Sequence, residues 1–140
     1  EITRFVHLGS GNYNEDTARL YTDIGLLTTN EVLANDVSEF FNVITGHSMP
    51  SQYQNLITAP RDMRNQLIEY IEQEAENARN GLPSGIFIKV NSLEDSEIIY
   101  ALYRASQAGV IIKLVIRGIC CLRPGRPGLS ENIEVISIVG

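Results

Sequence analysis

The apolar positions of the first 28 residues fall into two short runs that turn residues separate. Residues 4–8 and 23–28 have the length and composition of β-strands, and we expect them to share one sheet. The segment Gly-Ser-Gly-Asn at 9–12 predicts a tight turn after the first strand. A short helix is expected next, because Asn14 can cap its N-terminus and acidic residues occupy its first turn.

A helical spacing of apolar residues replaces this pattern from residue 31 to residue 45. The apolar residues that carry this spacing are Leu33, Val37, Phe40, Phe41 and Ile44. Residues 45–55 then contain several helix-breaking residues and no hydrophobic period, which indicates a linker. We therefore expect two partial domains, one over residues 1–55 and one over residues 56–140.

The second half of the chain predicts alternating helices and strands. Pro60 stands where a first helical residue is favoured, apolar residues then recur every three or four positions, and Gly81 ends the helix. The elements expected after it are a strand at 85–91, a helix at 94–109, a strand at 110–118 and a final strand at 133–139. A strand, a helix and a strand joined by short connections form a βαβ unit with parallel strands.

These elements place the chain in the α/β class. The strand at 110–118 is apolar on both faces except at Lys113, so we expect both of its faces to be covered. In open α/β sheets a ligand binds beyond the carboxyl ends of the strands. Lys89 and Asn91 lie at one such end and share a face, and Arg117 lies at another.

Composition limits the class of partner and the cellular compartment. The 140 residues carry a formal net charge of -6 at pH 7, which argues against broad nucleic-acid binding because that needs a basic face. No apolar stretch is long enough to span a membrane and no secretory signal is visible, so we expect a cytoplasmic protein. The neighbouring thiols of Cys120 and Cys121 are expected to be reduced, partly buried and free of metal.

Three arginines are candidates for binding an anion. Arg117 ends a largely apolar strand, where its charge needs a partner; the alternatives are a ligand and a carboxylate such as Asp95. Arg61 and Arg64 lie at the start of a predicted helix, which already carries partial positive charge. An anionic partner would relieve this repulsion, and side chains that point to solvent are the alternative.

The turn after the first strand is a further candidate site. Its glycines would let backbone amides approach a phosphate, and Asn12 and Asn14 offer hydrogen bonds, but the lysine and the spacing of a P-loop are missing. A turn beside a satisfied histidine is the alternative interpretation. His7 and His47 could each act as nucleophile or base, yet no triad spacing surrounds them. These residues alone predict an acidic α/β protein with a candidate anion site.

Three segments of the chain carry a resemblance to a known family. They are FVHLGSGNYNEDTARLYTDIGLLT, LPSGIFIKVNSLEDSEIIYALYRASQAGV and LVIRGICCLRPGRPGLSENIEVISIVG. In this order, and over essentially the whole chain, they resemble the C-terminal half of the bacterial polyphosphate kinases that work through a phosphohistidine. The resemblance implies two partial phospholipase D-like domains, each a mixed sheet with flanking helices. It also implies reversible transfer of the terminal phosphate of ATP to inorganic polyphosphate.

The resemblance assigns roles to three residues. The phosphorylated histidine of the family lies in a His-x-Lys segment, which the sequence does not contain, so His7 matches a supporting active-site group instead. Tyr21, in ARLYTD, and Arg117, in VIRG, match residues that contact ATP. The resemblance also implies Mg²⁺ as cofactor, although its ligands, the nucleophile and a further nucleotide-contacting histidine fall outside these residues.

A second group of residues is expected to bind phosphate. These candidates are Gly11, Asn12 and Asn14, which would line one wall of a cleft, and Arg64, Lys89 and Asn91, which come from the helix start and the strand ends. The expected ligands are ATP or ADP and inorganic polyphosphate. The resemblance further allows membrane association of a longer parent protein.

Two other functions stay open at this point. A phosphodiesterase of the phospholipase D type needs His-x-Lys motifs, which the sequence lacks. A non-catalytic module that holds an anionic polymer needs no nucleophile, but only the local arginines support it. Both chain ends have the character of cut ends, and a second domain that stops after three strands would expose sheet edges, so we also expect self-association.

Overall fold

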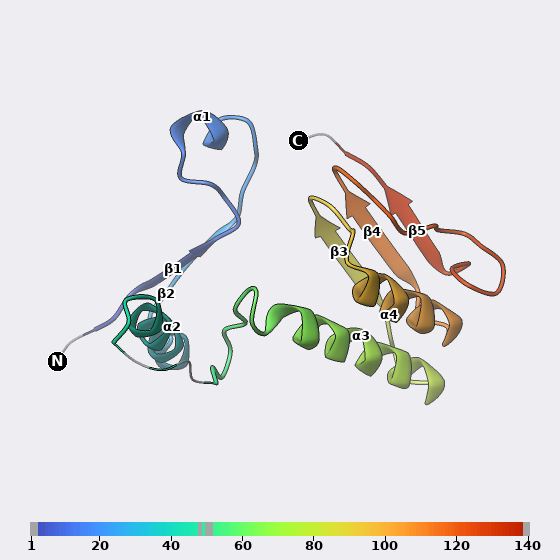
Figure 1. Cartoon of the computed structure of the whole chain (residues 1–140), viewed down its shortest axis with the longest axis horizontal. Helices are drawn as coiled ribbons and strands as arrows, with labels where there is room; N and C mark the ends of the chain where they lie inside the picture. Colours follow the sequence, from blue (N-terminus) through green and yellow to red (C-terminus); the bar gives the residue numbers. More distant parts are fainter. Residues whose placement is uncertain (1–2, 48, 50–51, 139–140) are drawn as a thin grey trace. The chain divides into compact units, whose positions relative to one another are not determined.

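The computed structural model describes residues 3–47, 49 and 52–138 (Figure 1). They form two compact units, one within residues 1–58 and one within residues 59–139, and each is described by itself. The elements of the first unit are β1 (Val6–Gly9), α1 (Glu15–Ala18), β2 (Gly25–Thr28) and α2 (Glu31–Ile44). Those of the second are α3 (Met63–Arg79), β3 (Ile86–Val90), α4 (Ser96–Gln107), β4 (Ile112–Ile116) and β5 (Ile133–Ile136).

The first unit contains the predicted pair of strands. β1 and β2 are antiparallel, with Val6 opposite Thr28 and Gly9 opposite Gly25. The loop between them holds α1, whose N-cap is Asn14, as the sequence predicts. Its side-chain oxygen accepts hydrogen bonds from the backbone amides of Asp16 and Thr17, which have no carbonyl partner within so short a helix.

Helix α2 covers nearly the predicted range, but few of its apolar side chains are buried. Ala34 and Asp36 are its buried residues. Phe41 and Ile44, which belong to the helical spacing, are 55% and 59% exposed. The described part of this unit has only a two-stranded sheet to set against the helix, so these two side chains stay outside a core.

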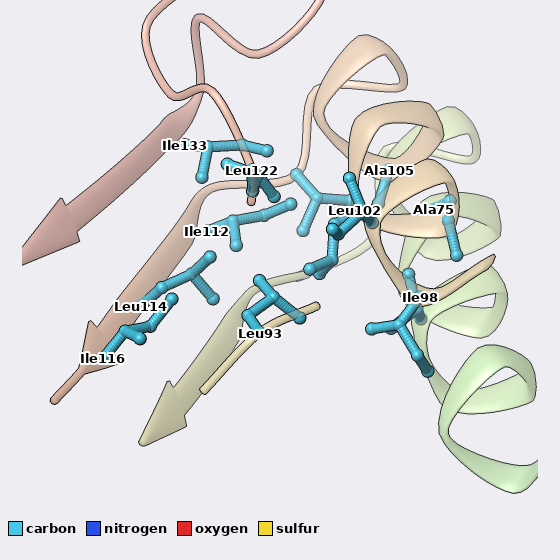
Figure 2. Close-up of a cluster of buried hydrophobic side chains, with 14 residues drawn as sticks. Ala75, Leu93, Ile98, Leu102, Ala105, Ile112, Leu114, Ile116, Leu122 and Ile133 are labelled. Atoms are coloured by element: carbon cyan, nitrogen blue, oxygen red, sulfur yellow. The ribbon is translucent and has the colours of Figure 1, made fainter. Parts of the chain in front are cut away.

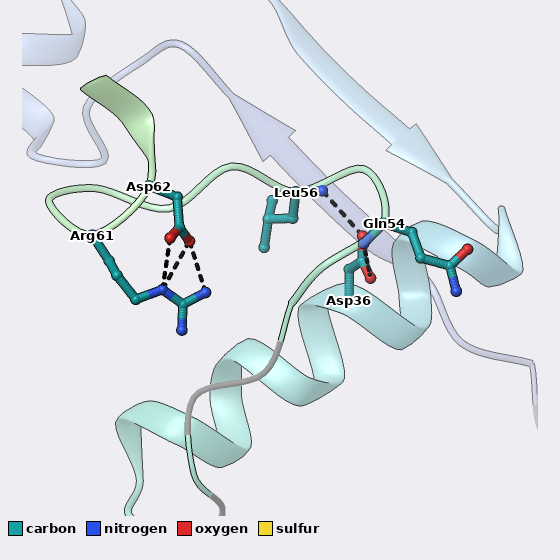
Figure 3. Close-up of polar contacts among 5 residues, drawn as sticks. All are labelled: Asp36, Gln54, Leu56, Arg61 and Asp62. Carbon is teal, nitrogen blue, oxygen red and sulfur yellow. Dashed lines mark hydrogen bonds and ion pairs between the residues drawn. The ribbon is translucent and has the colours of Figure 1, made fainter. Parts of the chain in front are cut away.

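Asp36 binds the segment that follows α2 back onto the helix (Figure 3). Its carboxylate accepts backbone hydrogen bonds from Gln54 at 3.1 Å, Asn55 at 2.7 Å and Leu56 at 3.0 Å. Gln54 and Asn55 lie in the stretch predicted to be a linker, and Leu56 follows it directly. Because the three bonds outweigh the effect of burial, they hold the pKa of the Asp36 carboxyl below its usual value.

The start of α3 differs from the sequence prediction. Pro60 lies in a turn after a cis Ala59–Pro60 peptide bond, and the helix begins only at Met63, with Asp62 as its N-cap. Arg61 forms an ion pair with Asp62 at 2.7 Å within this turn (Figure 3). Pro60 is therefore outside the helix, and Arg61 has a carboxylate partner instead of pointing freely to solvent.

The second unit is the predicted βαβ arrangement with one more strand. Its sheet has the order β3-β4-β5 with all strands parallel, and Ile86, Ile112 and Ile133 lie in register. Asp95 caps α4, and Gly109 follows its C-cap with φ of 101°, which suits glycine. Helix α4 covers one face of the sheet and α3 packs against α4 (Figures 1 and 2). The residues buried between them include Ala75, Leu93, Ile98, Leu102, Ala105, Ile112, Leu114, Ile116, Leu122 and Ile133 (Figure 2).

The two faces of this sheet are not equally covered. Both helices of the unit lie against the same face (Figure 1). On the other face Val115 is buried, but Phe87 is 72% exposed and Lys89 and Lys113 are exposed as well. The expectation that β4 is covered on both faces is therefore wrong for the described residues, because an apolar strand pattern shows what a strand can bury and not which element is present to bury it.

Candidate functional site

His7 has a defined position on β1. Its imidazole makes an edge-to-face contact with the ring of Tyr13, with 5.8 Å between centroids. Two glycines leave room for it: a β-carbon on Gly25 would stand 3.2 Å from Cε1 of His7, and one on Gly9 would stand 3.4 Å from Nε2. The glycines beside this turn therefore let backbone and imidazole lie close together, and the ring stays exposed.

The predicted turn is closed by Ser10 and Asp23. The Ser10 amide donates to the carbonyl of Ile24 at 3.0 Å, and the Ile24 amide donates to the Ser10 hydroxyl at 3.0 Å. The hydroxyl itself donates to the Asp23 carboxylate at 3.2 Å. A β-carbon on Gly11 would come within 2.7 Å of that carboxylate, so a larger residue at this position would have to displace the Asp23 side chain. Asp23 is a residue that the sequence analysis missed, and no local pattern pointed to it.

The two asparagines of the turn use their side-chain oxygens locally. Oδ1 of Asn12 accepts the backbone amide of Asn14 at 2.8 Å, and Oδ1 of Asn14 caps α1. The local hydrogen bonds of both carboxamides use the oxygen, so the NH₂ groups remain as their donors. This polarity suits an anionic ligand, because such a ligand needs donors.

Tyr21 lies between α1 and β2 and is 38% exposed. Tyr21 is thus partly accessible from solvent, as a contact with a nucleotide requires. Tyr21 and His7 belong to the first unit, whereas Arg117 belongs to the second.

The carboxyl ends of β3 and β4 bring Asn91 and Arg117 together. Nε of Arg117 donates to Oδ1 of Asn91 at 2.9 Å. The strands stay close beyond this pair, because the amide of Gly118 donates to the carbonyl of Asn91 at 2.6 Å. A β-carbon on Gly118 would stand 3.0 Å from that carbonyl oxygen and 3.0 Å from Oγ of Ser92. Gly118 and Ser92 therefore shape this end, and the sequence analysis named neither.

Arg64 and Asp95 form an ion pair, with 2.8 Å between Nε and Oδ2. Asp95 also accepts backbone amides of Glu97 and Ile98 as the N-cap of α4. The amide of Ile98 and the other bonds, together with the Arg64 charge, hold the pKa of the Asp95 carboxyl below its usual value. The sequence analysis offered Asp95 as a partner of Arg117 and left Arg64 to a ligand or to solvent. In the structure, Asp95 pairs with Arg64.

Lys89 is exposed on the face of the sheet that none of the described helices covers, and its strand leads directly into Asn91. Cys120 and Cys121 follow Arg117 along the same connection. Both thiols are free, as predicted, but both are exposed, so the expectation of partial burial is wrong. The reason is that the two cysteines lie beyond the end of β4, where the helices no longer cover the chain.

Metal-ligating clusters and membrane-spanning helices would each change the class of site expected here. Within residues 3–47, 49 and 52–138, no group of three or more His, Cys, Asp or Glu side chains is placed to hold a metal ion. In the same part of the chain, no helix is both long enough and apolar enough to cross a membrane.

The fold and these strand ends define an α/β protein with candidate anion-binding groups in both units. Comparison with known proteins narrows this class. The family model described as polyphosphate kinase C-terminal domain 1 matches residues 1–50, and the model described as polyphosphate kinase C-terminal domain 2 matches residues 56–140. The chain therefore belongs to the polyphosphate kinase family.

Individual relatives agree with this result. The chain is 55% identical to a polyphosphate kinase of Staphylococcus haemolyticus and 54% identical to one of Synechocystis sp., in each case over all 140 residues. A crystal structure of polyphosphate kinase from Porphyromonas gingivalis matches 99% of the chain and 23% of that protein, with a TM-score of 0.88 and 40% identity. The match supports the phospholipase D-like fold class. The chain spans 19% of the length of these two curated relatives.

Proposed function

We propose that the protein to which these residues belong transfers the terminal phosphate of ATP reversibly to inorganic polyphosphate, through a phosphohistidine outside residues 1–140. The observation that carries this proposal is the consecutive match to both C-terminal domain models, at more than half identity to proteins named polyphosphate kinase. Phosphoryl transfer depends mainly on positioning groups and stabilising charge. The residues described above would serve these two purposes.

Arg117 and Tyr21 are the proposed ATP contacts. The bond from Arg117 to Asn91 uses Nε and restrains the guanidinium, a planar group whose geometry suits phosphate oxygens. Restraint before binding lowers the entropy that the side chain loses on binding. Tyr21 would pack against the base or donate its hydroxyl to a phosphate, which its partial exposure allows.

His7 is proposed as a supporting group and not as the nucleophile. Its contact with Tyr13 and the space left by Gly25 support a fixed ring orientation. Gly11, Asn12 and Asn14 would line the same wall through backbone amides and carboxamide NH₂ groups.

Lys89, Asn91 and Arg64 stay predictions as direct phosphate contacts. For Arg64, a phosphate would have to compete with the Asp95 carboxylate that already binds it. Mg²⁺ is the cofactor expected of a kinase of this kind, but the described residues do not fit a site in which this chain holds the metal.

The test is a transfer assay on the full-length protein. ATP-dependent polyphosphate synthesis and the reverse formation of ATP from ADP are expected for the unchanged protein. Arg117→Ala and Tyr21→Ala should each raise the KM for ATP about tenfold or more, as expected for losing one charge-assisted or stacking contact. Arg79→Ala is the matched control, because Arg79 pairs with Glu76 on an exposed helix face. Absence of both reactions, or hydrolysis of phosphodiesters instead, would overturn the proposal.

A further inference from the structure

The connection between β4 and β5 is strongly basic within an acidic chain. Residues 117–129 contain Arg117, Arg123 and Arg126 and no acidic residue, whereas the whole chain has a net charge of -6. Figure 1 shows this connection in orange and red, running from the end of β4 to the start of β5. A local concentration of arginine in an acidic protein is a feature that net charge alone conceals.

Arg123 and Arg126 differ from the helical arginines of the same unit. Arg64, Arg79 and Arg104 each pair with a carboxylate, that of Asp95, Glu76 or Glu72. Arg123 and Arg126 are exposed, and neither guanidinium has a hydrogen bond or an ion pair with any residue that the structure describes. Their donors are therefore available to a ligand.

The backbone that carries these two side chains is held in place. Ser130 is fully buried, and its hydroxyl donates to the carbonyl of Arg123 at 2.5 Å and accepts the amide of Arg126 at 3.1 Å. The amide of Arg123 donates to the hydroxyl of Tyr103 on α4 at 2.9 Å. An ordered backbone lowers the entropy that the loop would lose on binding a ligand.

The neighbouring acid does not neutralise the arginines. The Glu131 carboxylate accepts the amide of Gly128 at 3.1 Å and so helps to close the loop. Gln107 donates to the carbonyl of Gly128 at 2.9 Å from the last residue of α4. The polar groups beside the arginines are therefore occupied in holding the loop, and the guanidinium groups are left to solvent.

The loop reaches a different edge of the sheet from the proposed ATP contact. Arg117 follows the carboxyl end of β4, whereas Gln107, which binds Gly128, ends the helix that leads into the amino end of β4. The five residues of β4 span about 16 Å at the usual strand rise. A ligand that contacts both edges must be long and must carry negative charge along its length.

We propose that residues 122–131 form a second phosphate-binding surface, where Arg123 and Arg126 contact the polyphosphate chain and not the nucleotide. This inference rests on the proposed function. Guanidinium groups bind phosphate oxygens through paired hydrogen bonds, and a linear polymer of phosphates offers such oxygens at regular intervals. Two arginines three positions apart in sequence, on an ordered backbone, suit a polymer better than a single phosphate group.

The experiment compares Arg123→Gln/Arg126→Gln with the unchanged full-length protein. In the reaction of ADP with polyphosphate, the double variant should raise the KM for long polyphosphate at least tenfold. The KM for ADP and the melting temperature should stay unchanged. Arg79→Gln controls for the loss of an exposed arginine. An unchanged KM for long polyphosphate would overturn the proposal.

A binding measurement separates this proposal from the proposed function. Fluorescence anisotropy with labelled long polyphosphate, on the same full-length proteins, reports the surface even if no transfer activity exists. Weaker binding of polyphosphate in the double variant, with unchanged binding of a single-stranded DNA of similar charge, would support the surface. Equal loss of both ligands would mean a general polyanion surface and would contradict the specific proposal, as would unchanged polyphosphate binding.

Discussion

Arg117 donates through Nε to Oδ1 of Asn91 at 2.9 Å and thereby joins the carboxyl ends of β4 and β3. The bond links residues 26 positions apart. It leaves the rest of an exposed guanidinium group with a restricted orientation. The restriction, more than the charge alone, distinguishes Arg117 from an ordinary surface arginine.

Asn91→Ala should weaken ATP binding by the full-length protein, by less than Arg117→Ala. Through its bond to Arg117 the asparagine orients the guanidinium, so a loss of about threefold to tenfold is expected, the worth of one neutral hydrogen bond. Calorimetric titration with Mg-ATP measures the effect. In the double variant the losses should not add, because the two residues act through one contact. Additive losses would show that Asn91 acts independently of Arg117.

Gly118→Ala should disturb the same strand ends through the backbone. The new β-carbon would meet the carbonyl oxygen of Asn91 at 3.0 Å, and a backbone carbonyl can move only with its strand. We expect a loss of about 1–3 kcal/mol of unfolding free energy, as for overpacking, measured by urea denaturation. Gly85→Ala is the control, because its β-carbon would make only an ordinary contact at 3.8 Å. Equal stability of the two variants would contradict the close approach.

Asp36→Asn should destabilise the first unit by about 1–3 kcal/mol at pH 7, because three backbone amides bonded to the buried Asp36 side chain would lose an ionised acceptor. Glu31→Gln, an exposed change in the same helix, is the control. Urea denaturation followed by circular dichroism gives both values.

The effect of Asp36 should also depend on pH in one direction. Its pKa is lower in the folded protein than the ordinary value of 3.8, so the ionised carboxylate stabilises the folded state above that value. This stabilisation is lost as the pH falls through the folded pKa. The difference between the unchanged protein and Asp36→Asn should therefore shrink below about pH 3.8. A difference that stays constant from pH 7 to pH 3 would contradict the assignment.

Asp95→Ala should lower the stability of the folded protein more than Arg64→Ala does. The first change removes the N-cap of α4, which is worth about 1 kcal/mol. It also removes the carboxylate that pairs with Arg64. The second removes only an exposed ion pair, worth less than about 1 kcal/mol. Thermal denaturation compares them. If Arg64→Ala instead weakened ATP binding without changing stability, Arg64 would be a phosphate contact after all.

His7→Gln should lower the rate of phosphate transfer by the full-length protein, whereas His47→Gln should not. His7 is held by Tyr13 and by the glycine backbone, while His47 contacts the hydroxyl of Thr45 in an exposed turn. Steady-state assays give kcat for each variant. Abolition of protein phosphorylation by His7→Gln would indicate that His7 is itself the nucleophile and would correct the present assignment.

Local patterns predicted most of the elements. The two strands of the first unit, helix α2 and the βαβ arrangement follow from apolar spacing, and the position of Asn14 predicts its role as N-cap of α1. The start of α3 was predicted too early, because a proline that suits a first helical position is equally suited to the turn that precedes the helix. The exposure of Phe41, Ile44 and Phe87 was also unpredictable, because burial depends on elements that a local pattern does not contain.

For the candidate site, too, some features follow from local sequence patterns and others from the tertiary fold. Alternation and chain order are enough to place Lys89, Asn91 and Arg117 at the strand ends. The pairing of Asp95 with Arg64, 31 positions away, and of Arg117 with Asn91 arises from the folded arrangement of distant segments. Caps and turns depend on neighbours within a few residues, whereas partners of charged side chains depend on which distant segments the fold brings within hydrogen-bonding distance.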